Sequence, residues 1–123
     1  MAEIVLAEEL RTAANMLRGM IDAARADLTR SSYYGHDEAN YTQGINNACG
    51  GEAAELAASY TPRLADITVE WLEGCADDVE AATKVARQWR GSTATVDDVL
   101  GWCDETDSVR RALAYARLLN GAS

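Results

Sequence analysis

Carboxylates dominate the side chains that could carry chemistry in this chain of 123 residues, which contains 20 acidic and 11 basic side chains. Two glutamate pairs share one spacing, since Glu52 precedes Glu55 by three positions and Glu70 precedes Glu73 in the same way. Mg²⁺ prefers oxygen ligands in an octahedral array, so carboxylates that converge inside a helical protein would suit it. One interpretation of the chain is therefore a magnesium-dependent enzyme.

These pairs resemble those of the all-helical nucleotide pyrophosphohydrolases, which hold magnesium with Glu-x-x-Glu on one helix and Glu-x-x-Asp on the next. The resemblance implies nucleotide hydrolysis with Glu52, Glu55, Glu70 and Glu73 as ligands. The chain departs from the pattern at Glu73, where those enzymes have aspartate. Helical spacing also places Glu70 and Glu73 opposite the apolar stripe of their segment, which turns them toward water. We keep the hydrolase as an alternative and otherwise expect no cofactor, no metal site and no catalytic residue.

The glutamates of the second pair belong to a longer row of acids, which we call the acidic ridge: Asp66, Glu70, Glu73, Asp77 and Glu80. At the turn of an α-helix these acids fall within roughly ±40° of one line. The expected core stripe on the opposite side is Leu64, Ile67, Trp71, Leu72, Cys75, Val79, Ala82, Ala86 and Trp89. Like charges three or four residues apart each cost a helix about 0.2–0.5 kcal/mol. We therefore interpret the ridge as a surface that binds a basic patch on another protein.

A second group of acids contains no base and would extend that surface: Asp97, Asp98, Asp104, Glu105 and Asp107. A basic patch that normally holds nucleic acid is one such partner. The ridge alone has one charge per roughly 5 Å of helix, whereas duplex DNA has one per about 1.7 Å. Mimicry of DNA would therefore require both groups of acids.

The remaining reactive side chains form no catalytic or metal pattern. His36 is the only histidine, and the glutamate needed for a di-iron Glu-x-x-His pair does not precede it. Cys49, Cys75 and Cys103 lack the paired spacing of a zinc site or a disulfide framework. Because Cys75 and Cys103 lie on apolar stripes, we expect them to be buried reduced thiols with raised pKa values.

Composition limits the class of protein. Apolar residues make up 48% and charged residues 25% of the chain, as in an ordinary globular domain. The net charge of -9 disfavours direct binding to nucleic acid or to an anionic membrane. The acidic start MAEIVLAEEL does not have the form of a secretion signal, and no apolar run is long enough to span a bilayer. We expect a cytoplasmic protein with a single domain over 1–123.

Periodicity predicts an all-α fold, an antiparallel helical bundle without a sheet. The expected helices cover 3–30, 38–59, 62–90, 96–104 and 107–119. Pro62 suits the first position of the third helix, and Gly91 suits its end. Thr95 is the expected N-cap of the fourth helix, and Thr106 or Asp107 that of the fifth. The heptad-like stripe of the first helix would also suit a homodimer, so a self-assembling structural subunit is a further alternative.

One segment carries a resemblance to a group of proteins. The run from Ala53 to Ala76 resembles a pattern in small helical proteins of actinobacteria and their phages, in which an alanine-rich stretch leads through a proline into a helix with an apolar pair and an acid. The matching positions are Ala57, Ala58, Pro62, Ala65, Trp71, Leu72 and Glu73. The resemblance implies a phage or a bacterium that exchanges phages as the setting, and a binding protein that engages or inhibits a host or defence protein. Such a protein, acting through its acidic helix faces, is the function that we expect.

Overall fold

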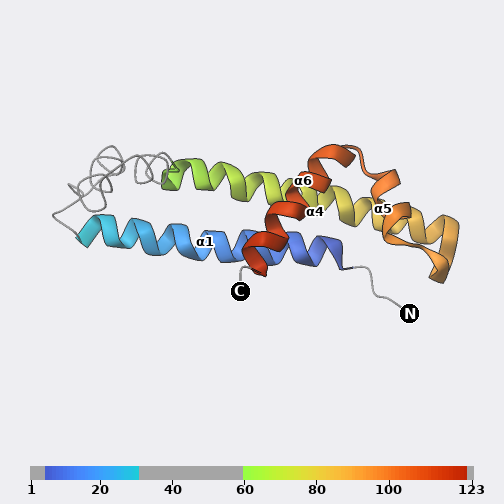
Figure 1. Cartoon of the computed structure of the whole chain (residues 1–123), viewed down its shortest axis with the longest axis horizontal. Helices are drawn as coiled ribbons and strands as arrows, with labels where there is room; N and C mark the ends of the chain where they lie inside the picture. The colour runs from blue at the N-terminus through green and yellow to red at the C-terminus, as the bar shows by residue number, and fades with distance from the viewer. Residues whose placement is uncertain (1–4, 31–59, 122–123) are drawn as a thin grey trace. The chain divides into compact units, whose positions relative to one another are not determined.

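A computed structural model describes residues 5–30 and 60–121, and every regular element within these ranges is helical (Figure 1). The elements are α1 (Leu6–Arg30), α4 (Pro62–Arg90), the short 3₁₀ helix η2 (Gly91–Thr93), α5 (Val96–Trp102) and α6 (Thr106–Asn120). The all-α prediction is confirmed for this part of the chain. Within the described ranges there are four α-helices where five were predicted, because the expected helix over 38–59 lies outside them, as do residues 3 and 4 of the first expected helix. That helix begins at Leu6, so its predicted start is wrong at Val5, which is described and is not helical.

The long helix α4 begins and ends where the sequence predicts. Pro62 is its first residue, and the hydroxyl of Thr61 accepts a hydrogen bond from the N–H of Leu64 at 3.3 Å. Gly91, directly after the last residue, has a φ of 58°, in the left-handed region that glycine adopts without strain. Local residue types therefore decide both ends of this helix.

The N-cap of α5 is also confirmed. The side chain of Thr95 accepts from the N–H of Asp98 at 3.1 Å, and the Asp98 carboxylate accepts from the N–H of Thr95 at 2.9 Å. This reciprocal pair is a capping box. The helix ends at Trp102, two residues before the predicted end at 104, because Cys103 has an extended backbone with φ -67° and ψ 143°.

The predicted cap of α6 is wrong. The helix runs from Thr106 to Asn120, one residue longer at each end than predicted, and its N-cap is Glu105, whose side chain makes no capping bond. The hydroxyl of Thr106 instead donates to the carbonyl oxygens of Leu100 at 2.9 Å and Cys103 at 3.3 Å. The start of α6 is thus held by contacts from outside the helix.

The chain divides into two compact units. The first unit comprises Met1–Met16 and Val69–Ser123, and the second comprises Leu17–Thr68. In the first unit, the buried side chains of α1 are Leu6, Leu10, Ala13 and Ala14. In the second unit, Leu17, Ile21 and Ala65 are buried. Alanine is frequent among the buried residues, and its small side chain allows helix backbones to approach closely.

The core stripe of α4 is narrower than predicted and is rotated about the helix. Of the expected residues, Leu72, Cys75, Val79, Ala82 and Ala86 are buried. Leu64, Ile67 and Trp89 are instead 46%, 58% and 73% exposed, and Trp71 is half-buried. Their places in the core are taken by Ala65, Val69 and Ala76. The prediction that this helix hides both of its tryptophans is wrong, because close packing favours the line of small residues over the line of large ones.

Helix α6 is fixed against both other long helices of the first unit. Near its start, Ser108 accepts a hydrogen bond from the indole N–H of Trp71 on α4 at 2.8 Å. Near its end, Arg117 contacts both carboxylate oxygens of Glu9 on α1 at 3.2 Å, and the Asn120 amide donates to the Glu9 carbonyl oxygen at 3.0 Å. These bonds place α6 across the first turns of α1 and the middle of α4 (Figure 1).

Candidate binding surface

Asp66, the first acid of the acidic ridge, forms an ion pair in the second unit. Its carboxylate accepts two hydrogen bonds from the guanidinium of Arg25 on α1, at 2.7 and 3.4 Å. Both side chains are less than half exposed, at 45% for Asp66 and 41% for Arg25. This two-point geometry is the stronger form of the arginine–carboxylate contact. Asp66 is therefore engaged within the chain.

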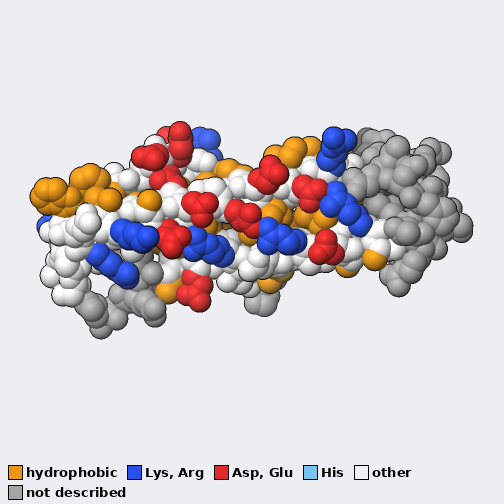
Figure 2. All heavy atoms as spheres, turned by 180° about the vertical axis from the view of Figure 1, so that it is seen from behind, with side chains coloured by type: hydrophobic (Ala, Val, Ile, Leu, Met, Phe, Trp, Pro, Cys, Tyr) orange, Lys and Arg blue, Asp and Glu red, His pale blue; other side chains and the backbone are white. Residues whose placement is uncertain are grey.

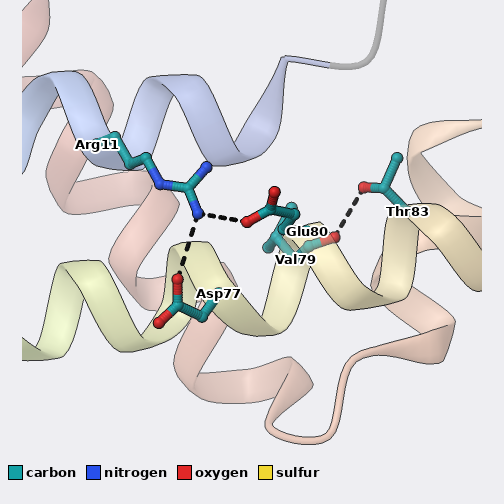
Figure 3. Close-up of polar contacts among 5 residues, drawn as sticks. All are labelled: Arg11, Asp77, Val79, Glu80 and Thr83. Carbon is teal, nitrogen blue, oxygen red and sulfur yellow. Dashed lines mark hydrogen bonds and ion pairs between the residues drawn. The ribbon is translucent and has the colours of Figure 1, made fainter.

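Two further acids of the ridge share one arginine in the first unit. Arg11 on α1 donates to Asp77 at 3.2 Å and to Glu80 at 2.7 Å (Figure 3). The hydrogen bond from Arg11 lowers the pKa of Glu80, and the same contact raises the pKa of Arg11. The Thr83 hydroxyl, one turn further, donates to the Val79 carbonyl oxygen and takes no part in this pair. Arg11 offsets the repulsion that the sequence implies between neighbouring ridge acids.

The other two acids of the ridge also belong to the magnesium alternative. Glu70 is exposed and has no hydrogen bond or ion pair in the described part of the chain, and Glu73 is half-buried. Glu52 and Glu55 lie outside the described residues. Among residues 5–30 and 60–121, no group of three or more side chains of the metal-binding types could hold an ion. Within these ranges, Glu70 and Glu73 therefore belong to no group of side chains that could bind a metal ion.

Charge on the helical surface is therefore mixed. Figure 2 shows acidic and basic side chains interleaved over one face of the molecule. Independently of this view, Arg11 and Arg25 each pair with acids of the ridge. A partner that approached these acids would compete with an arginine of the same chain, so the ridge is a weaker docking surface than its sequence suggests.

Most acids of residues 97–107, which we call the acidic segment, differ from the paired acids of the ridge in having no basic partner. Asp98 serves the capping box of α5 and lies 3.9 Å from Arg90. The hydrogen bond from the Thr95 backbone N–H lowers the pKa of Asp98. The others are exposed, and their carboxylates make no hydrogen bond or ion pair within the described ranges: Asp97, Asp104, Glu105 and Asp107. The acidic segment thus gathers four exposed acids whose carboxylates make no ion pair within these ranges.

The backbone of the acidic segment is bound by an acid that belongs to neither predicted group. The carboxylate of Asp78 on α4 accepts hydrogen bonds from the backbone N–H groups of Asp104 at 2.9 Å and Glu105 at 3.0 Å. It fixes the turn between α5 and α6 and leaves the Asp104 and Glu105 side chains in solvent. Sequence reasoning missed Asp78, although its position was a signal, since it borders the apolar stripe beside Cys75 and Val79.

An open cleft beside the acidic segment contains two tryptophans. It has a volume of about 560 Å³ and is lined by Trp89, Arg90, Asp97, Asp98, Gly101 and Trp102. Trp89 is 73% and Trp102 is 50% exposed. The sequence prediction placed Trp89 in the core and did not single out Trp102. The available signal was the helical line of α5, because Trp102 lies off the line of Val99, Leu100 and Cys103, which are buried.

The described thiols are structural. Cys75 and Cys103 are both buried and free. Burial raises the pKa of Cys75, and it raises the pKa of Cys103 to about 11. The Cys75 sulfur lies 3.6 Å from the Ser108 hydroxyl, and the Cys103 thiol donates to the Val99 carbonyl oxygen at 3.4 Å. The predicted burial and raised pKa are confirmed, and at neutral pH neither group is a thiolate nucleophile.

Compared with known proteins, the chain matches no family model, no curated protein and no solved structure. Within the described residues, no helix is both long and apolar enough to cross a membrane.

Proposed function

We propose that this chain is a binding protein that docks on a basic surface of a partner protein. The observation that carries the proposal is the juxtaposition of uncompensated acids with exposed aromatic surface. Asp97 belongs to both, since it is an unpaired member of the acidic segment and lines the cleft that contains Trp89 and Trp102, which we call the tryptophan cleft. Tryptophan is enriched among the residues that contribute most to protein–protein binding, and charge complementarity directs the approach of a partner.

The charge of the chain supports such a partner. A net charge of -9 attracts a basic protein over a range of about 10 Å at 0.1 M salt. Because Asp66, Asp77 and Glu80 already face arginines, we assign the main role to the acidic segment and a secondary one to Glu70. The partner class includes proteins whose basic surface normally holds nucleic acid.

The proposed function includes an arrangement of the helices, a cellular compartment and a class of partner. We propose that the helices form one antiparallel bundle, in keeping with their short connections between residues 90 and 106. Two free buried thiols suit a reducing compartment such as the cytoplasm. The resemblance of residues 53–76 to proteins of actinobacteria and their phages supports a host or defence protein as the partner, with inhibition as the outcome.

The experiment compares two variants with the same change in charge. The first neutralises the acidic segment with Asp97→Asn, Asp104→Asn and Glu105→Gln. The matched control neutralises exposed acids that have no assigned binding role, with Glu8→Gln, Asp22→Asn and Asp77→Asn. Both are titrated with a synthetic peptide of alternating arginine and glycine by calorimetry at low and at moderate salt.

The proposal expects the first variant to bind the peptide at least tenfold more weakly than the control. Equal losses in both variants would show that only net charge matters, which would contradict a defined binding surface. Absence of binding by the unaltered chain at low salt would end the proposal.

A further inference from the structure

The tryptophan cleft is formed where α4 ends and α5 passes beside it. Its aromatic walls are Trp89 and Trp102, and Gly101 contributes no side chain to it. A methyl group at Gly101 would meet no atom within 4 Å apart from its chain neighbours and the backbone of its own helix. Gly101 therefore leaves room in the cleft that a larger side chain at this position would occupy.

The core under this cleft is complete without the indoles. Ala86 on α4 and Val99 on α5 are both 0% exposed, although they neighbour the two tryptophans in sequence. An indole offers about 150–250 Å² of surface for burial, and here much of it faces solvent. Two large aromatic side chains that line one cleft and add little to the core are typical of a contact surface.

The charges of the cleft select the chemistry of its occupant. Asp97 has no counter-ion, while Asp98 is committed to its capping box and lies 3.9 Å from Arg90. The faces of indole rings attract cations, and guanidinium groups also stack on them. A carboxylate at the same place adds a charge-assisted hydrogen bond. Aromatic walls with one unpaired carboxylate form a site that complements an arginine side chain.

We propose that an arginine of the basic partner inserts into the cleft between Trp89 and Trp102 and pairs with Asp97. This inference rests on the proposed function and assigns its central contact. Other occupants fit less well. A purely apolar segment would take Asp97 out of water without a partner, and a second copy of a chain with net charge -9 would be repelled.

The test titrates the full chain by calorimetry with the alternating arginine–glycine peptide and with the same peptide carrying neutral citrulline in place of arginine. Two variants alter the cleft at exposed positions: Trp102→Leu shortens one wall, and Gly101→Leu places a side chain in the opening. Leu118→Ala removes a side chain that is 75% exposed and does not line the cleft, and it serves as the control. Circular dichroism verifies that each variant keeps its helices.

We expect the arginine peptide to bind the cleft variants about 3- to 30-fold more weakly than the unaltered chain, and the control within twofold. The citrulline peptide should bind at least tenfold more weakly than the arginine peptide. Equal binding of the arginine peptide to the cleft variants would overturn this inference and leave the proposed function standing. Equal binding of both peptides would also overturn it, as would a dimer in light scattering that Trp102→Leu dissociates. If the unaltered chain binds neither peptide, the proposed function falls as well.

Discussion

Asp78 offers a sharp test of how the acidic segment is held. Its carboxylate on α4 accepts the backbone N–H groups of Asp104 and Glu105, at 2.9 and 3.0 Å. It thereby acts as a cap supplied from a distant part of the chain to the turn before α6. The change Asp78→Ala leaves both donors to solvent and removes this attachment, while the helix propensity of position 78 improves slightly.

The expected loss follows from the number and setting of the bonds. Removing a local capping side chain costs about 0.5–2 kcal/mol. Here two N–H groups lose a charged acceptor, yet both bonds are solvent-exposed, so water replaces part of the lost energy. We expect Asp78→Ala to lower the free energy of unfolding by about 1–2 kcal/mol, which corresponds to a fall in Tm of roughly 4–8 °C for a domain of this size.

The neighbouring aspartate provides a matched control. Asp77 makes an ion pair with Arg11 at 3.2 Å, and its side chain is 79% exposed. Exposed ion pairs contribute little, and Arg11 retains Glu80 as a partner, so Asp77→Ala should cost at most about 0.5 kcal/mol. Urea unfolding followed by circular dichroism measures both variants under identical conditions.

The comparison can refute the reasoning directly. If Asp77→Ala and Asp78→Ala lower the free energy of unfolding equally, the backbone attachment of the turn contributes nothing. Hydrogen exchange gives a second readout, because the first amides of α6 should lose protection in Asp78→Ala and keep it in Asp77→Ala. Unchanged protection in both variants would contradict the assigned role of Asp78.

Three further predictions concern the core, the pH dependence and the thiols. Leu72→Ala, at a fully buried position, should lower the free energy of unfolding by about 2–5 kcal/mol. Ile67→Ala, at a position that is 58% exposed, should lower it by less than about 1 kcal/mol. If urea unfolding shows a greater loss for Ile67→Ala than for Leu72→Ala, the buried stripe of α4 is wrongly assigned. The folded pKa of Asp98 lies below its ordinary 3.8, so its contribution to stability is present above pH 3.8 and is lost as the pH falls through the lower folded pKa. In this acidic range, the free energy of unfolding should therefore fall more steeply with decreasing pH for the unaltered chain than for an Asp98→Asn variant. Identical slopes in urea unfolding at a series of pH values would contradict this. A Cys49→Ser variant leaves two thiols, Cys75 and Cys103, which are both buried, and the pKa of Cys103 is raised to about 11. At pH 8 these thiols should react with a disulfide reagent at least a hundredfold more slowly in the native state than in urea. Rapid reaction in the native state would show that they are accessible.

The parts of the fold that could be predicted are those decided by local chemistry. Proline, glycine and threonine mark the ends of α4 and the start of α5, because each acts on the backbone within a few residues of itself. The helical period of the apolar residues likewise indicated an all-α chain. These signals act over one turn of helix, so one sequence is enough to find them.

The candidate surface was predicted less well, because it depends on which residues meet across the fold. The acidic ridge follows from spacing on one helix, but its pairing with Arg11 and Arg25 depends on the packing of α1. The same applies to Trp89, which shares the apolar face of α4 in sequence and is 73% exposed in the fold. The hydrophobic period shows where an apolar face points, whereas only the neighbouring helices decide how wide a strip of it is covered.

The sequence by itself determined the helical class, the bounds of α4, the cap of α5 and the burial of Cys75 and Cys103, since these depend on short-range hydrogen bonding, backbone preference and the helical period. The tertiary structure alone decided which acids are neutralised and which stay exposed, how Asp78 holds the turn before α6, and that two tryptophans share one cleft. These features join side chains that are far apart along the chain, and such distances are set by packing.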